Sequence, residues 1–287
     1  MAPRTAPRKK VPVWQEVEQA EARKVGSRVR AARAKRRGRR YAVVYDTSGP
    51  KVRLGVLWFV VAVTAIAVGP LAVGLVYGGT AALAALQTAR DWRKRRLRPN
   101  DQVAAAMAGA MGLGACLGAG GAGLAVLAGV GVAYVVATGD TGSPNRAVAD
   151  AGWTVQCALP PGIVALSMVL LTRLDQGSAI GLLLLVSAYE TGDYLVGSGA
   201  RNPYEGPAAG ASAMVVITFI LSTLPISALD FGQAWLLGGL CLLLAPLGQL
   251  AASALLPTAA SPASALRRLD SLLLAAPLWC IGVGLVV

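Results

Sequence analysis

The chain has 287 residues, of which 55% are hydrophobic and only 14% are charged, a composition that excludes an ordinary soluble domain. It carries 27 Lys and Arg against 14 Asp and Glu, and 16 of the basic residues lie in residues 1–53. Histidine is absent, which excludes Ser-His-Asp catalysis and histidine-based metal sites. The four cysteines occur singly in apolar runs, so we expect buried thiols rather than a disulfide framework.

Residues 1–53 form a strongly basic segment, distinct from the apolar remainder at 54–287. We expect no cleavable signal peptide, because the first apolar run begins only near Leu54. A solvated cytoplasmic tail and a segment held by anionic lipid headgroups are both compatible with this charge. Nucleic-acid binding is the least favoured interpretation, and no nucleic-acid partner is expected, since no recognisable binding motif accompanies the basic residues.

The apolar remainder divides into runs of membrane-spanning length, which must be helical because lipid offers the backbone no hydrogen-bond partners. The first run is too long for one span and contains Gly69-Pro70, which predicts a helical hairpin of about 54–68 and 71–89. Residues 103–138 repeat this arrangement around a glycine-rich break at Gly118–Gly123. Five further spans are expected, at about 151–172, 178–196, 208–228, 232–256 and 271–287.

Charge sets the expected orientation of these spans. If the first apolar run forms two spans, the basic tail and the basic run Arg90–Arg98 lie on the same side of the membrane, as the positive-inside rule requires, whereas a single span would place them on opposite sides. The predicted fold is therefore an all-α integral membrane protein of about nine transmembrane helices, with a cytoplasmic N-terminus, located in the cell membrane. The loops at 139–150, 197–207 and 257–270 are then expected to face the cytoplasm as well.

Polar motifs interrupt the second half of the apolar region. They are Glu190–Tyr194 (Glu-Thr-Gly-Asp-Tyr), Tyr204–Gly206 (Tyr-Glu-Gly), Gly248–Leu250 (Gly-Gln-Leu) and Leu266–Ser271 (Leu-Arg-Arg-Leu-Asp-Ser). Ionisable groups close to membrane spans are costly and are functional candidates by default. Glu190 and Asp193 are three residues apart, so they share one face of a helix. There they could hold a divalent cation through their oxygens, or simply cap the span and face water.

These motifs, in this order, resemble those of the phosphatidate cytidylyltransferase (CDP-diacylglycerol synthase) family. That family typically has Asp-Thr-Gly-Ala-Tyr at the end of a span, and then a loop that ends in Trp-Glu-Gly. It continues with Gly-Asp-Leu-x-Glu-Ser and closes with Leu-Asp-Arg-x-Asp-Ser before a final apolar helix. The resemblance is clearest over residues 180–287 and most specific at Leu266–Ser271.

The resemblance implies a fold built to transfer a cytidylyl group from CTP to phosphatidate, which requires metal ions that neutralise phosphate charge. Two metal-holding Asp positions of the family fall on Gln249 and Arg267, and neither side chain is an anionic ligand. We therefore expect lost or altered catalysis, with an anionic phospholipid or CTP bound at the cytoplasmic face. The candidate residues for phosphate or substrate contact are Arg201, Tyr204, Glu205, Ser253, Arg267, Arg268 and Ser271.

Two alternatives stay open. An active CDP-diacylglycerol synthase would use a rebuilt Mg²⁺ site, with Glu190, Asp193 and Asp270 as its candidate catalytic and metal-binding residues. A transporter or structural membrane subunit of unrelated ancestry is also compatible with the glycine-rich spans, although no inverted repeat is evident. Apart from Mg²⁺ in an active enzyme, no cofactor is expected. The expected partners are membrane lipids, and a second copy of the chain or another membrane protein.

Overall fold

The computed structural model describes residues 51–95, 97–141, 143–200, 202, 204–224, 227–258, 261 and 263–286. The basic tail expected at 1–53 therefore lies, except for its last three positions, outside the described residues. Within the described part, all regular structure is helical and there is no strand. This result confirms the expected all-α class.

Nine α-helices run through the described residues. They are α2 (Lys51–Val68), α3 (Pro70–Arg93), α4 (Asp101–Gly114), α5 (Ala119–Thr141), α6 (Pro144–Leu174), α7 (Gln176–Gly197), α8 (Glu205–Thr223), α9 (Phe231–Ala254) and α10 (Leu272–Val286). Short 3₁₀ turns lie at Ala115–Leu117, after α4, and at Leu266–Arg268, before α10. Each expected span coincides with one of these α-helices.

Two of the expected boundaries are wrong, and proline explains both. α6 begins at Pro144 rather than near 151, because proline in the first turn favours helix initiation before the apolar run starts. α8 ends at Thr223 rather than near 228, because residue 225 is proline, which disfavours a helical conformation in the residue before it.

Six of the helices, α3 and α5 to α9, are long and apolar enough to cross a membrane. This finding confirms a multi-pass membrane protein. The helices α2, α4 and α10 are shorter apolar helices. Nine membrane crossings therefore stay a prediction, although the helices occur in the expected number and order among the described residues.

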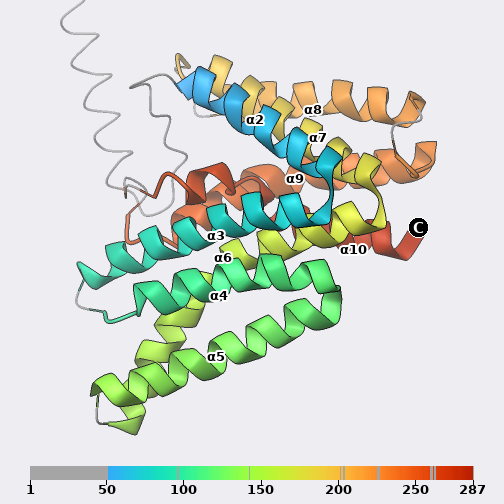
Figure 1. Cartoon of the computed structure of the whole chain (residues 1–287). Helices are drawn as coiled ribbons and strands as arrows, with labels where there is room; N and C mark the ends of the chain where they lie inside the picture. The colour runs from blue at the N-terminus through green and yellow to red at the C-terminus, as the bar shows by residue number, and fades with distance from the viewer. Residues whose placement is uncertain are drawn as a thin grey trace, which may run out of the picture.

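The helices run alternately between two ends of the bundle (Figure 1). At one end lie the start of α2 and the connections α3–α4, α5–α6, α7–α8 and α9–α10. The other connections and the end of α10 lie at the opposite end. Every described Lys and Arg except Arg173 lies near the first end, which we call the basic end.

Glycine produces the first two chain reversals at the opposite end. Gly69, between α2 and α3, has a φ of 126°, and Gly118, between the 3₁₀ turn and α5, has a φ of 98°. Residues with a Cβ rarely adopt such positive φ values. The expected helix breaks at Gly69-Pro70 and within Gly118–Gly123 are thus confirmed.

Small residues allow the central helices to pack closely. α6 packs against α3, α4, α5 and α10. Where α3, α4 and α6 meet, a Cβ added at Gly112 would lie 3.0 Å from the Cα of Gly78 and 3.1 Å from the Cβ of Ala165. Such close backbone approach is typical of membrane helices, which associate through packing rather than through the hydrophobic effect.

The close contact at Gly112 predicts a position-specific loss of stability. We expect Gly112→Leu to destabilise the protein by about 1–3 kcal/mol, because the new side chain forces α3 and α6 away from α4. Gly131→Leu in α5 is the matched control, since nothing lies within 4 Å of a Cβ at that position. Thermal unfolding of both variants in detergent measures the difference. Equal unfolding temperatures would contradict the packing described here.

Candidate functional site

Three of the polar motifs converge at the basic end of the bundle. The end of α7, the end of α9, and the 3₁₀ turn with the residues that join it to α10 supply a set of residues that we call the polar cluster: Glu190, Asp193, Gln249, Ser253, Arg267, Arg268, Asp270 and Ser271. Glu190 interacts electrostatically with Asp270, Arg268 and Asp193. Residues separated by about eighty positions in the chain therefore share one electrostatic environment.

Arg267 connects two of the converging segments. Its Nη1 donates to Ser253 Oγ in α9 at 3.0 Å and lies 3.8 Å from Asp270 Oδ2. The other carboxylate oxygen of Asp270 accepts from the Ser271 backbone N–H at 2.8 Å and from the Ser271 hydroxyl at 3.3 Å. The guanidinium thus lies between α9 and the buried Asp270 carboxylate, which offsets the cost of placing either charge away from water.

This geometry requires a glycine in α9. A Cβ added at Gly248 would overlap the Asp270 carbonyl oxygen and lie 3.2 Å from the Ser271 carbonyl oxygen. Because position 248 has no side chain, the backbone of the 270–271 segment lies directly against α9. The Gly-Gln-Leu motif therefore contributes its glycine to packing and its glutamine to the polar cluster.

The long connection between α9 and α10 is also anchored to α3. Trp92 Nε1 donates to the Leu255 carbonyl oxygen at 2.8 Å, just after α9. Gln87 Oε1 accepts from the Ala265 backbone N–H at 3.0 Å, just before the 3₁₀ turn. These two positioning residues were not predicted from the sequence. The only available signal was a pair of hydrogen-bonding side chains at the end of an otherwise apolar run.

Several buried polar atoms near the polar cluster have no hydrogen-bond partner among the described residues. The Gln249 Oε1 atom is one of them, and the hydroxyls of Tyr77 and Tyr189 are two others. Both tyrosines interact electrostatically with Glu190. Since buried polar groups in proteins are nearly always paired, such atoms are candidates to contact a ligand or ordered water.

The three candidate carboxylates approach one another without forming a recognisable metal site. Asp193 and Glu190 both interact electrostatically with Asp270. No group of three or more His, Cys, Asp or Glu side chains within the described part of the chain is arranged to hold a metal ion. Mg²⁺ binding by Glu190, Asp193 and Asp270 therefore stays a prediction.

The remaining candidate residues are not brought into the polar cluster. Tyr204 is 76% exposed, and Glu205, which begins α8, is also exposed. Neither side chain forms a hydrogen bond or ion pair with a described residue of the polar cluster. Arg201 lies outside the described residues.

The polar cluster predicts a pH-dependent stability. Burial raises the pKa of Asp270 to about 6, while Arg267 and Ser271 offset part of this effect. In the unfolded chain the carboxyl group ionises near pH 4, so the unfolded state binds fewer protons than the folded state between about pH 4 and 6. We expect the unfolding temperature to fall as pH rises through this window, and Asp270→Asn to reduce the slope. Thermal unfolding of both proteins in detergent across this pH range tests the prediction. If the unfolding temperature of Asp270→Asn depends on pH as steeply as that of the unchanged protein, the prediction is wrong.

A pair of glycine substitutions tests the contact between α9 and the 270–271 segment. Gly→Ala inside a helix ordinarily stabilises by up to about 1 kcal/mol, and we expect this for Gly239→Ala, where nothing lies within 4 Å of a new Cβ. Gly248→Ala should instead destabilise by about 1–3 kcal/mol, because its Cβ displaces the Asp270 backbone. Thermal unfolding of the two variants should thus shift in opposite directions. A shift in the same direction would argue against the contact.

Comparison with known proteins identified no relative: no family model, curated protein or solved structure matches this chain. A function must therefore be inferred from the positions of its own charged and polar side chains, together with the motif resemblance in its sequence.

Proposed function

We propose that the chain is a phosphatidate cytidylyltransferase-like membrane protein with lost or altered catalysis, whose polar cluster binds a phosphate group of an anionic phospholipid. The observation that carries this proposal is the convergence of the ends of α7 and α9 with the 266–271 segment. These segments carry three of the motifs on which the resemblance rests. Their meeting at one end of the bundle supports a common site.

The chemistry of the polar cluster suits a phosphate group. Arg267 and Arg268 are half-buried, and guanidinium groups bind phosphate oxygens through paired, charge-assisted hydrogen bonds. The amide of Gln249 and the hydroxyls of Ser253 and Ser271 add uncharged hydrogen-bonding groups. Phosphatidate, whose headgroup is a bare phosphate, is the lipid that best matches such a small site at a membrane boundary.

Altered catalysis follows from the position of Arg267. In the family, carboxylates hold the metal ions that neutralise the reacting phosphates. Here the guanidinium of Arg267 is held by Ser253 and lies near Asp270. A fixed cation thus stands among groups that would otherwise surround a metal ion. Arginine can clamp a phosphate but does not supply an exchangeable metal site.

In the orientation that we propose for the protein in the membrane, its basic end faces the cytoplasm. Nine crossings, six by the longer helices and three by the shorter ones, would be consistent with the alternating helix directions in Figure 1. The concentration of arginines at one end supports a cytoplasmic location for that end and for the N-terminus, in the cell membrane. The polar cluster would then face the compartment that contains CTP.

Phosphatidate binding by the purified protein in detergent tests the proposal. We expect the double substitution Arg267→Ala with Arg268→Ala to weaken binding at least about tenfold, because two charge-assisted contacts are lost. Arg95→Ala, an exposed arginine at the same end, is the matched control and should bind normally. Titration calorimetry measures the affinities. Unchanged phosphatidate affinity in the double variant would overturn the site assignment.

The meeting of Glu190, Asp193 and Asp270 supports a second candidate function, an active CDP-diacylglycerol synthase. Its test is CTP-dependent conversion of phosphatidate in the presence of Mg²⁺. Turnover that disappears in Asp270→Ala would replace the first proposal by the second. Phosphatidate binding without turnover would support the first.

A further inference from the structure

A hollow of about 320 Å³ lies at the basic end, apart from the polar cluster. Its lining residues come from the α3–α4 connection, the end of α5 and the start of α6: Leu97, Arg98, Asp140, Arg146, Ala149, Asp150 and Trp153. None of these residues belongs to the polar cluster or to the motifs that resemble a known family. The hollow therefore needs an explanation of its own.

Among the described residues, the charged side chains of this hollow have no ion-pair partner. The side chains of Arg98, Arg146, Asp140 and Asp150 form no ion pair or hydrogen bond with another described residue, and the Thr154 hydroxyl donates only to the backbone carbonyl oxygen of Asp150. Nearby charged groups are paired instead: Arg90 and Arg93 contact Asp101 at 2.8 and 2.9 Å, and Lys94 contacts Asp91 at 2.8 Å. The hollow thus presents two cations and two anions that remain available to a ligand.

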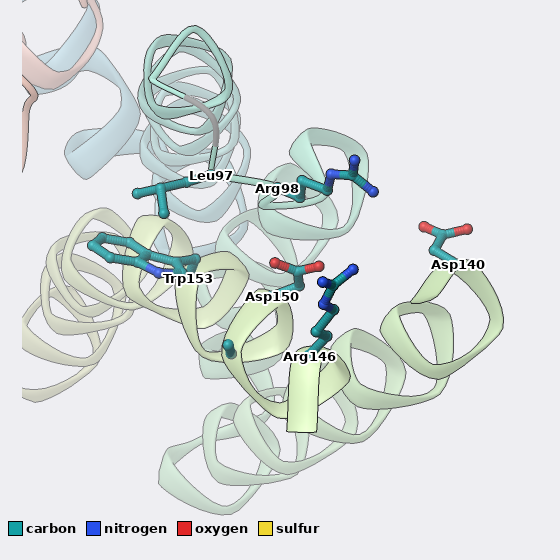
Figure 2. A pocket seen from close by; sticks show the side chains of 7 residues that line it. Leu97, Arg98, Asp140, Arg146, Asp150 and Trp153 are labelled. Carbon is teal, nitrogen blue, oxygen red and sulfur yellow. The ribbon is translucent and has the colours of Figure 1, made fainter. Parts of the chain in front are cut away.

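Figure 2 shows how these groups are arranged. The Asp150 carboxylate lies between the Arg98 and Arg146 side chains, and Asp140 projects from the end of α5 on the far side of Arg146. Trp153 and Leu97 lie together on the other side and form an apolar wall. A ligand in the hollow would therefore meet both signs of charge within a short distance and an aromatic surface beside them.

Packing fixes the position of Trp153 and of the helices α5 and α6 that line the hollow. The rings of Trp153 and Trp92 lie 5.1 Å apart between centroids, and Trp92 is itself fixed by its hydrogen bond to Leu255. Ala137 of α5 packs with Ala147 and Ala151 of α6, which joins the two helices beneath the charged groups. Packing between helices thus fixes the α5 and α6 side of the hollow, while Leu97 and Arg98 come from the connection between α3 and α4.

From these observations we infer that the hollow binds the phosphoethanolamine headgroup of a zwitterionic phospholipid. Arg98 and Arg146 would hold the phosphate, and Asp150, assisted by Asp140, would accept hydrogen bonds from the ammonium group. Val148, in the same turn of α6, is 60% exposed and offers an apolar surface to an acyl chain. Tryptophan at this level matches the aromatic belt found at membrane interfaces.

The same chemistry disfavours other headgroups. A choline group has no N–H to donate, so the carboxylates would lose the hydrogen bonds that a primary ammonium provides. A glycerol headgroup carries no positive charge and leaves the phosphate close to two carboxylates. The hollow should therefore select a phosphate and a primary ammonium that occur together.

Binding of dihexanoyl phosphatidylethanolamine to the full chain in detergent, followed by titration calorimetry, tests this inference. We expect binding at least about tenfold tighter than for the phosphatidylcholine and phosphatidylglycerol of the same chain length. Arg146→Gln and Asp150→Asn should each weaken phosphatidylethanolamine binding about tenfold. Glycerophosphoethanolamine, which lacks acyl chains, distinguishes recognition of the headgroup from recognition of the whole lipid. Binding that remains selective without chains assigns the site to the headgroup alone.

Matched controls separate this site from general effects. Arg95→Gln changes an exposed arginine at the same end, and Asp230→Asn changes the N-cap of α9, where asparagine caps equally well. Both should bind phosphatidylethanolamine as the unchanged protein does. Equal affinity for the three lipids, or normal binding by both Arg146→Gln and Asp150→Asn, overturns the inference. The Arg267 and Arg268 double variant should retain this binding, so failure of the proposed phosphatidate site would be seen separately.

Discussion

The absence of a side chain at Gly248 is the constraint on which the polar cluster depends. It lets the backbone at Asp270 lie directly against α9, so that Arg267 reaches Ser253 while Asp270 and Ser271 face the end of α7. Each charge is then near an opposite charge or a hydrogen-bonding group. Such pairing is necessary at the boundary of an apolar bundle, because the free-energy cost of an isolated charge is far higher there than at a water-exposed surface.

The two sites at the basic end share one supporting element, which is the end of α3. Trp92 donates to the carbonyl oxygen of Leu255 beside the polar cluster and packs against Trp153 beside the hollow. Gln87, one and a half turns earlier in the same helix, holds the 3₁₀ turn that carries Arg267. The end of α3 therefore contacts both the α9–α10 connection, which carries the arginines of the polar cluster, and α6, which carries Arg146 and Asp150 of the hollow.

The sequence predicted the helices well and the contacts between them poorly. Hydropathy located every α-helix of the described residues, and Gly69 and Gly118 marked real chain reversals, because breaks in an apolar run depend on local backbone preferences. The gathering of Glu190 with Asp270 was suggested only by the motif resemblance. Tyr204 and Glu205, which belong to an equally suggestive motif, are exposed instead. The hollow around Asp150 had no signal in the sequence, since its residues form no motif and meet only where the α3–α4 connection, the end of α5 and the start of α6 come together.

The length of α9 has a consequence for the surrounding lipid. α9 has 24 residues and is about 36 Å long at the α-helical rise, which exceeds the ~30 Å hydrocarbon core of a typical bilayer. In the proposed nine-span arrangement, the exposed Leu236, Leu243 and Leu247 would face acyl chains along this greater height. The helix would then tilt, or the bilayer beside it would thicken, at a modest cost for each ångström of mismatch.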